Sequence, residues 1–314
     1  MATISPSKLI KPEHVCVLLI GFNRPELLKK RVKELYKSSA SSIYISIDGG
    51  LESHTREMAE FKTYAINLLG NQIINLHHHE NNLGLVKHIT ETISKIFITF
   101  EYIIVVEDDV ILSNNFYCNM ISGLNLQKML NLNGVVSGGS TIYNKNKKNK
   151  WKYVATPGIW GWACSAAIWN GVNFDLAKVD LKSELEKSNT WRKLTKFEKK
   201  YWISKFTKVQ SDPFYSWEYQ FIYHLFKNNF VSISPIFSMT GNEGFGDTRA
   251  THTSEGKPRR IDKINAELNN SLILRLSRFS SLHNLFRVET WYYRKKISIA
   301  TFIKSFAENS YKAP

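Results

Sequence analysis

The first half of the chain alternates short apolar runs with amphipathic helical patterns. Apolar runs of strand length lie at 14–20, 43–47, 73–76 and 102–106. Helical periodicity occupies about 25–35, 52–69 and 85–97. Continuous apolar strands separated by helices are typical of a parallel sheet that is covered on both faces. We therefore predict an α/β fold with a Rossmann-like, mostly parallel sheet flanked by helices.

The pattern becomes less regular after Asn131. A strand is expected at 135–140, and the lysine-rich segment 181–209 is expected to be helical. The segment 242–253 is rich in glycine and polar residues, which predicts a loop. Beyond Arg260, leucine and phenylalanine alternate with arginine in amphipathic helical patterns. We therefore expect a folded α/β domain at 1–260 and a basic amphipathic helical tail at 261–314.

Two of the predicted strands end in carboxylates. Asp48 follows the strand at 43–47, and Glu107-Asp108-Asp109 follows the strand at 102–106. Ligands bind beyond the carboxyl ends of parallel strands. Adjacent carboxylates at the end of a buried strand repel one another unless a cation neutralises them, and oxygen ligands suit Mg²⁺ or Mn²⁺. The triplet therefore predicts a metal site, with a solvated acidic turn before a helix as the structural alternative.

The overall charge narrows the class of partner. The chain has 42 basic and 27 acidic residues, a formal net charge of +15. Such an excess favours anionic partners, among them nucleotide diphosphates, anionic lipid headgroups, acidic glycans and nucleic acid. The sequence has no zinc-finger spacing, RNP-type aromatic motif or basic-region heptads, so we do not expect nucleic acid.

Cysteine usage and hydropathy bear on localisation. Cys16, Cys118 and Cys164 are far apart, which predicts neither a disulfide framework nor a CxxC metal site. Residues 1–11 lack the apolar core of a signal peptide, and no run reaches the roughly 18 apolar residues of a membrane span. These features predict a cytoplasmic protein. The basic tail could lie on the inner face of the membrane, where each basic residue contributes about 1 kcal/mol.

The segment from Val15 to Ile111 resembles glycosyltransferases of the GT-A fold. More narrowly, the chain resembles N-acetylglucosaminyltransferase I and related family 13 enzymes. The stretch 105–109 matches the family's acidic motif, whose last aspartate, here Asp109, holds the metal. The stretch 46–50 matches the strand end that contacts the donor base, here through Asp48. The stretch 21–24 matches the first strand end, where an arginine, here Arg24, helps to hold the nucleotide.

Further segments match the family in the same order. His88 falls at the donor-contacting histidine, if a gap of two residues is accepted. The stretch 157–162, with Gly161, resembles a proline-glycine-x-glycine-tryptophan turn. The stretch 214–218 resembles the segment that carries the catalytic base, although the family's acidic pair appears here as Ser216-Trp217-Glu218. The stretch 241–253, with His252, resembles a loop that closes over the donor. The resemblance covers about three-quarters of the 314 residues.

The resemblance implies an inverting glycosyltransferase. It would move a sugar from a nucleotide-sugar, UDP-linked in the first instance, to a hydroxyl of a glycan or lipid-linked glycan. Glu218 would be the general base, with Asp212 as the alternative, and Asp109 would hold Mn²⁺ or Mg²⁺. Contacts to the donor would come from Arg24, Asp48, His88, Glu107, Asp108, Gly161 and His252. A cytoplasmic enzyme of polysaccharide biosynthesis fits this combination.

Several of these residues also have a structural interpretation. Asp48 could simply begin an Asp-Gly turn, and His88 could be a packed helix residue. Glu218 could be a carboxylate favoured at a helix start, although partial burial would raise its pKa and suit it to general-base chemistry. The triplet His77-His78-His79 is predicted to be structural, because adjacent strand residues point to opposite faces. The tryptophans Trp160, Trp162 and Trp217 could stack on sugars or belong to the core.

Two other function classes remain open on the sequence. A sugar nucleotidyltransferase shares the fold class and the metal carboxylates. It typically carries a glycine-rich, basic loop after the first strand, and the stretch 21–25 is a poor version of that loop. A non-enzymatic binding module for an anionic polymer would explain the charge of +15 but not the carboxylates at strand ends.

Overall fold

The protein is described by a computed structural model, which covers residues 9–50, 55–139, 151–236, 238–245, 247 and 249. The predicted tail at 261–314 and His252 lie outside the described residues, so the statements about them stay predictions. Among the helices of the described part, none is both long and apolar enough to cross a membrane.

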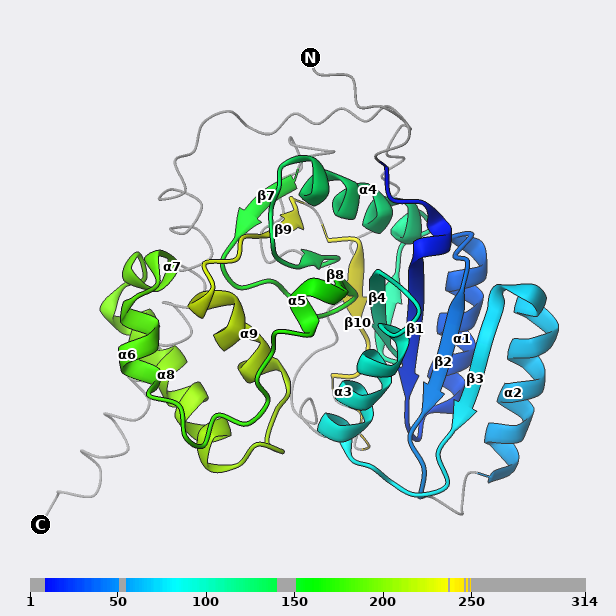
Figure 1. Cartoon of the computed structure of the whole chain (residues 1–314). Coiled ribbons are helices and arrows are strands. Elements are labelled where there is room, and N and C mark those ends of the chain that lie inside the picture. The colour runs from blue at the N-terminus through cyan, green and yellow to red at the C-terminus, as the bar shows by residue number, and fades with distance from the viewer. Residues whose placement is uncertain are drawn as a thin grey trace, which may run out of the picture.

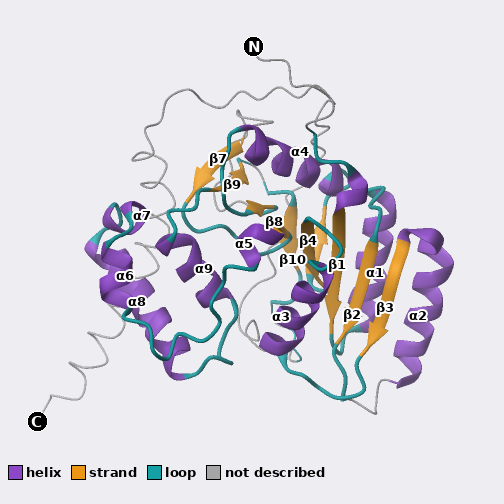
Figure 2. Cartoon of the chain, viewed as in Figure 1, coloured by secondary structure: helices purple, strands orange, loops and turns teal. Residues whose placement is uncertain are grey.

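The core of the described fold is an eight-stranded sheet with the order β3-β2-β1-β4-β8-β6-β9-β7 (Figures 1 and 2). Its strands are β1 (Val15–Gly21), β2 (Ile43–Ile47), β3 (Ile73–His78), β4 (Tyr102–Glu107), β6 (Val136–Ser137), β7 (Trp151–Val154), β8 (Trp162–Ser165) and β9 (Ser232–Pro235). A separate two-stranded sheet pairs β5 (Val110–Leu112) with β10 (Thr240–Asn242). The four apolar runs of the sequence are thus confirmed as β1–β4.

The strands β1 to β4 are parallel, whereas β8 runs antiparallel to β4. In the register of these strands Leu19 of β1 lies between Ile45 of β2 and Val106 of β4. The carboxyl ends of β1, β2 and β4 therefore meet at one edge of the sheet, the lower edge in Figure 1. This edge is where the predicted ligand-binding residues lie.

Helices cover both faces of the sheet, as predicted. One face packs against α1 (Pro25–Lys37), α2 (Thr55–Leu69) and α4 (Phe116–Met129), and the other against α3 (Leu85–Ile96), α5 (Ala166–Trp169) and α9 (Glu218–Lys227). Alternate residues of β1 serve the two layers: Leu19 packs with Leu28 of α1, and Leu18 packs with Ile89 of α3. β1, β2 and β4 are buried on both faces, which explains their unbroken apolar runs, whereas the edge strand β3 is partly exposed.

The lysine-rich segment forms three helices, α6 (Leu181–Glu186), α7 (Asn189–Arg192) and α8 (Lys196–Ser211). Each begins at a side-chain N-cap, and at α8 Thr195 and Glu198 form a capping box. The aromatic residues of α8 and α9 pack together, with Phe206 against Phe226. In Figure 1 this helical lobe lies on the opposite side of the molecule from α1 and α2.

The strand predicted at 135–140 is shorter than expected. β6 contains only Val136 and Ser137, because the next amide, that of Gly138, bonds to the carbonyl of Gly161 outside the strand ladder. A Cβ atom at Gly138 would lie 2.5 Å from that carbonyl oxygen. The close approach of two backbones thus ends the strand and fixes the turn that leads into β8.

Candidate active site

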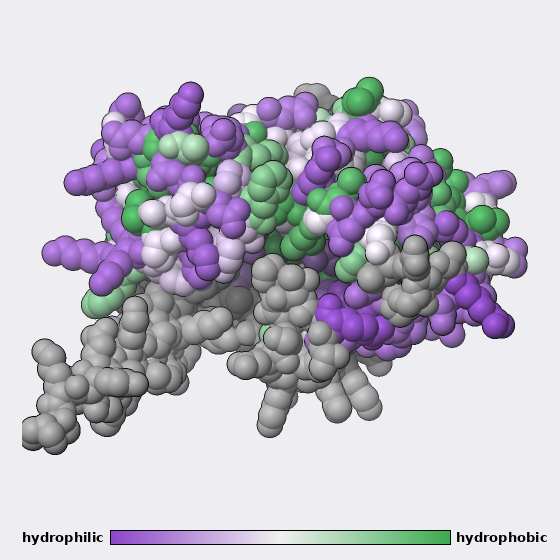
Figure 3. Space-filling model, turned by 90° about the horizontal axis from the view of Figure 1, so that it is seen from below, coloured by the Kyte–Doolittle hydropathy of each residue, from purple (hydrophilic) through white to green (hydrophobic). Residues whose placement is uncertain are grey.

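A cavity of about 670 Å³ opens at the carboxyl edge of the parallel strands. Its walls come from the ends of β1, β2 and β4, the start of α3, the turn before β8, the end of β10 and the stretch from Tyr215 to Tyr219. Figure 3 views the molecule from this end, where hydrophilic side chains gather on both sides and apolar surface shows between them. Segments from both halves of the chain therefore build one cavity.

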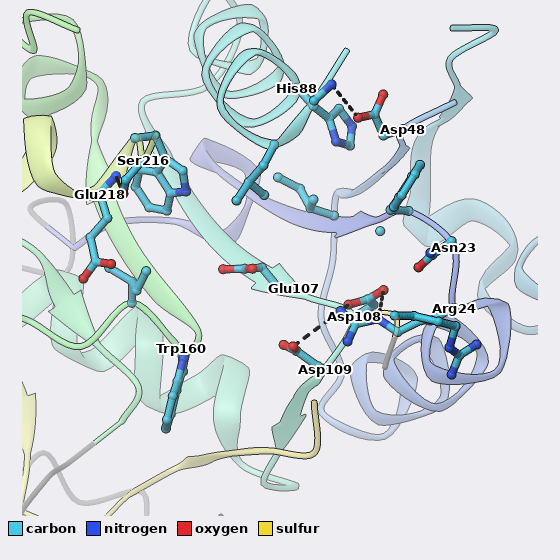
Figure 4. A pocket seen from close by; sticks show the side chains of 18 of the residues that line it. Asn23, Arg24, Asp48, His88, Glu107, Asp108, Asp109, Trp160, Ser216 and Glu218 are labelled. Carbon is cyan, nitrogen blue, oxygen red and sulfur yellow. Dashed lines mark hydrogen bonds and ion pairs between the residues drawn. The ribbon is translucent and has the colours of Figure 1, made fainter. Parts of the chain in front are cut away.

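The cavity has two chemically different sides (Figure 4). Arg24, Asp108 and Asp109 lie on one side, and Glu218 lies on the other. The carboxylate of Glu107 extends into the space between them. Acidic groups therefore face the cavity from both sides, and Arg24 lies beside Asp108 and Asp109.

Arg24 and Asp108 form a bidentate ion pair. The Nε atom of Arg24 donates to Oδ2 of Asp108 at 3.1 Å, and Nη2 donates to Oδ1. The two side chains are only 12% and 4% exposed. Arg24 precedes Pro25, the first residue of α1, so the start of that helix holds the guanidinium against the end of β4. Burial opposes the charge of Arg24, but Asp108 and Asp109 outweigh it and raise the pKa of the guanidinium.

Asp109 is held by the segment that follows β10. Its Oδ1 accepts a hydrogen bond from Asn242 at 3.2 Å, and its backbone carbonyl accepts one from the amide of Glu243 at 2.9 Å. A Cβ atom at Gly244 would lie 2.3 Å from Oδ2 of Asp109, so only glycine allows this approach. Burial raises the pKa of Asp109, while Arg24, whose Nη2 lies 3.4 Å from Oδ2, works in the opposite direction.

The donor set suits a cation that shares its coordination with phosphate. Within the described ranges no group of three or more histidine, cysteine or acidic side chains could hold a metal ion by itself. Asp108 has both oxygens committed to Arg24, which leaves Glu107 and Asp109 as the carboxylates of the triplet that could hold a cation. Mg²⁺ and similar ions are commonly held by one or two carboxylates together with substrate phosphates. The residues therefore fit a metal that binds with a phosphorylated ligand.

Arg24 also offers a donor to that ligand. Its Nη1 atom is buried and has no hydrogen-bond partner among the described residues. An unpaired buried donor is unfavourable, and an anionic ligand oxygen would satisfy it. One guanidinium could thus bind the protein's carboxylate and a ligand oxygen together.

Asp48 organises the loop that precedes α3. Its Oδ1 accepts hydrogen bonds from the amides of Gly49 and Leu83, and its Oδ2 accepts one from Gly84. Asp48 thus has a structural role, but its carboxylate holds the loop before α3 rather than beginning the Asp-Gly turn that was the structural alternative. Asp48 nevertheless lines the cavity, so the two interpretations coexist.

His88 lies in α3 beside Asp48 (Figure 4). Its Nε2 is 2.8 Å from the hydroxyl of Ser46. Burial lowers the pKa of His88 to about 4, although the charge of Asp48 opposes this shift. His88 is consequently a neutral imidazole at pH 7, and it reaches the cavity as a hydrogen-bonding or stacking group rather than as a charge.

Glu107 and Glu218 have strongly perturbed acidities. Burial, reinforced by the charges of Asp109 and Asp108, raises the pKa of Glu107 to about 8. Burial raises the pKa of Glu218 to about 7, and Lys205 opposes the shift. A carboxyl group whose pKa lies near the working pH can both accept and release a proton, which suits general acid–base chemistry.

Three of the predicted residues do not line the cavity. Asp212 is exposed at the end of α8, where its Oδ1 accepts from the amide of Phe214. Gly161 has a φ of +64°, and its carbonyl accepts from Gly138, so its contribution is to the shape of the turn. Among the tryptophans, Trp160 and Trp217 line the cavity, whereas Trp162 is fully buried between Trp217 and Trp169 and belongs to the core.

The sequence did not single out several residues that the fold brings to the cavity. Asn82, Tyr219 and Arg249 line it, and Asn242 holds Asp109. Isolated asparagines and tyrosines carry no motif. Their participation depends on contacts such as Asn242 to Asp109, which are 133 residues apart.

Comparison of the sequence with protein-family models and with curated proteins finds no match. Solved structures with a related arrangement of elements do exist. A mannosyltransferase from Pyrobaculum calidifontis in complex with GDP-Man and Mn²⁺ matches with 11% identity and a TM-score of 0.37, over 55% of this chain and 51% of the other. The match thus spans about half of that enzyme's length.

Two nucleotidyltransferase-type enzymes are similar to a comparable degree. A 4-diphosphocytidyl-2C-methyl-D-erythritol synthase from Anaerococcus prevotii matches with 10% identity and a TM-score of 0.33, over 53% of this chain and 77% of the other. A UDP-glucose pyrophosphorylase in complex with UDP-glucose matches with 10% identity and a TM-score of 0.29, over 50% of this chain and 77% of the other. With TM-scores below 0.5 these matches support no conclusion about the activity of this chain.

The Arg24–Asp108 pair predicts a rescue between two variants. Arg24→Gln should lower the free energy of unfolding by about 3 kcal/mol, because it leaves Asp108 buried without its partner. Adding Asp108→Asn should restore part of this loss, since the amide carries no charge. Urea unfolding at pH 7 measures both, with Arg56→Gln at an exposed position as control. A double variant no more stable than Arg24→Gln would contradict the pairing.

The raised pKa of Glu218 predicts a pH-dependent gain in stability on its replacement. The carboxyl has a pKa of about 7 in the fold against an ordinary value of 4.5, so folding is penalised increasingly as the pH rises through this window. Glu218→Gln should therefore be more stable than wild type above pH 7, by up to about 3 kcal/mol, and equal to it below pH 4.5. Unfolding at several pH values, with exposed Glu57→Gln as control, tests this; a constant difference would refute the shift.

Proposed function

We propose that the protein is a metal-dependent, inverting glycosyltransferase. It would move a sugar from a nucleotide-sugar, with a UDP-sugar as the first candidate, to a hydroxyl of a glycan or lipid-linked glycan. One observation carries the proposal. The acidic strand end with its arginine lies across a single cavity from Glu218, a carboxyl with a pKa of about 7.

The side formed by Arg24 and Asp109 is the proposed site of the donor diphosphate. Asp109 would hold Mn²⁺ or Mg²⁺, whose charge offsets the negative charge of the departing nucleotide. The unpaired Nη1 donor of Arg24 supports a contact to a phosphate oxygen. Asp48 and His88, at the end of β2 and in α3, line the part of the cavity proposed for the nucleoside.

Glu218 is the proposed general base on the opposite side. Its carboxylate takes the proton of the acceptor hydroxyl as the acceptor oxygen forms a bond to the anomeric carbon. The bond between that carbon and the diphosphate oxygen breaks, and the nucleoside diphosphate leaves with the bonding electrons. Attack from the face opposite the leaving group inverts the anomeric centre. A base on the side away from the diphosphate site is what this displacement requires.

The segment after β10 is proposed to close the donor side. Asn242 bonds to Asp109, and Arg249 pairs with Glu26 of α1 and with Asp247. Because this segment touches Asp109 directly, its position and that of the diphosphate would depend on each other. His252, predicted to contact the donor, follows three residues later in the chain.

Nucleotidyl transfer is the competing reaction for such a cavity. The cations that line the cavity among the described residues are Arg24 and Arg249, and both are already paired with carboxylates. A triphosphate substrate carries more charge than a nucleotide-sugar and would call for additional free cations. This charge balance favours glycosyl transfer.

Metal-dependent nucleotide binding tests the donor site. Calorimetry should show UDP binding in the presence of Mn²⁺ and much weaker binding in EDTA, because Asp109 would hold the cation that offsets the charge of the diphosphate. Asp109→Asn should abolish the metal-dependent part, whereas Asp175→Asn at an exposed position should not. Metal-independent binding would refute the role of Asp109. Tight binding of UTP, with release of pyrophosphate on adding a sugar 1-phosphate, would favour the nucleotidyltransferase.

Turnover tests the base and decides between the two acidic candidates. Glu218→Gln should lower kcat by about 10²–10⁴-fold, whereas Asp212→Asn, outside the cavity, should stay near wild type. The wild-type kcat should rise with pH and reach a plateau above about pH 7, because only the ionised Glu218 accepts a proton. The reverse pattern of the two variants would assign the base to Asp212.

A further inference from the structure

A row of alternating tyrosines and lysines lies along α8 and the start of α9. We call Tyr201, Lys205, Lys208, Tyr215 and Tyr219 the tyrosine–lysine wall. The rings of Tyr215 and Tyr219 are stacked, with centroids 6.2 Å apart and planes inclined by 24°. Lys208 Nζ lies 3.6 Å from the centroid of Tyr215. Lys205 Nζ lies 5.3 Å from the centroid of Tyr201 and 5.4 Å from that of Tyr219.

The wall continues the cavity on the side of Glu218. Tyr215 and Tyr219 line the cavity on either side of Glu218 in the sequence. Lys205 is close enough to Glu218 to oppose the rise in its pKa that burial causes. In Figure 1, α8 and α9 lie together in the helical lobe, away from the donor side formed by β1, β4 and α1. A molecule that reaches Glu218 from this side would meet the wall.

The two lysines differ from their neighbours in having no ion-pair partner among the described residues. Lys199 and Lys227 of the same lobe pair with Glu186 and Glu184. By contrast, neither Lys205 nor Lys208 has a carboxylate within ion-pairing distance in the part of the chain that the structure describes. Ring faces orient an ammonium group without neutralising it. The wall therefore presents ordered positive charge to whatever binds there.

Lys205 and Lys208 could attract an anionic group to the side of the cavity that contains Glu218. Glu218 faces the cavity and must be ionised to act as the base, so it would repel an acceptor that carries a negative charge. Lys205 and Lys208 would offset this repulsion at the acceptor side. A neutral acceptor would need no such compensation.

We propose that the tyrosine–lysine wall is the acceptor subsite and that it takes a glycan carrying a carboxylate or phosphate group near the accepting hydroxyl. This inference rests on the proposed function and specifies its acceptor. Lys205 and Lys208 bind the anionic group, and the tyrosines contact the sugar through their hydroxyls and ring edges. The anion thereby fixes which hydroxyl lies beside Glu218.

Single-stranded nucleic acid is the other polyanion that aromatic and basic residues recognise. Its bases stack on open aromatic faces, which supply much of the binding free energy. Here lysine ammonium groups lie over Tyr215 and Tyr219, and these two rings stack on each other. The wall therefore offers charge and ring edges rather than free ring faces, which favours an acidic glycan.

Matched probes with and without charge test the proposal. Calorimetry would compare tetragalacturonate with its methyl ester, and mannose 6-phosphate with mannose, in the presence of UDP and Mn²⁺. The variant Lys205→Gln/Lys208→Gln removes the two proposed contacts. Lys196→Gln/Lys200→Gln makes the same change in charge at exposed positions of the same helix.

Wild type should bind at least one charged probe about tenfold more tightly than its neutral partner, and the Lys205/Lys208 variant should lose this preference. The Lys196/Lys200 variant should retain it. Which charged probe is preferred distinguishes a carboxylate from a phosphate. Equal binding of charged and neutral probes, an equal loss in both double variants, or tighter binding of a thymidine oligonucleotide than of either charged glycan would overturn the proposal.

The same titrations separate this inference from the proposed function. UDP binding in Mn²⁺ should be unchanged in the Lys205/Lys208 variant, because both lysines lie outside the donor side. Loss of the glycan preference with UDP binding intact would support the wall as an acceptor subsite. Absence of UDP binding in wild type would refute the donor site, whereas intact UDP binding without any preference for charged probes would refute the wall alone.

Discussion

The buried ion pair between Arg24 and Asp108 is the interaction on which the rest of the cavity depends. It joins the start of α1 to the end of β4, and it neutralises one of three adjacent carboxylates where the sheet meets the cavity. Because Arg24 occupies both oxygens of Asp108, Asp109 and Glu107 are the carboxylates of the triplet that remain available to a ligand. Without the arginine, three desolvated carboxylates would repel each other at the end of a buried strand.

The second half of the chain supplies the side of the cavity that faces the acidic end of β4. The lobe of α8 and α9 brings Glu218 opposite the acidic strand end, in surroundings that raise its pKa to about 7. The segment after β10 packs on Asp109, with Gly244 allowing the contact.

The features that were predicted from the sequence are those that depend on residues close together in the chain. The strands β1–β4, the helix α1 and the position of the acidic triplet at a strand end were predicted, because apolar periodicity and chain order determine them. Glu218 was predicted as the base with Asp212, six residues away, as the alternative, and this order came from the family resemblance rather than from local periodicity. Glu218 faces the cavity and Asp212 is exposed, because Asp212 caps the end of α8 whereas Glu218 begins α9.

By itself the sequence determined the α/β layers and the edge at which ligands bind, since continuous apolar strands between amphipathic helices bury both faces of a sheet. Only the tertiary structure decided which polar groups share that edge. The bond from Asn242 to Asp109, the approach of Glu218 to the acidic side and the packing of Trp162 into the core depend on contacts between distant segments. The tertiary structure also decided the pKa values of Glu107 and Glu218. Burial raises both, and the neighbouring carboxylates raise that of Glu107 further.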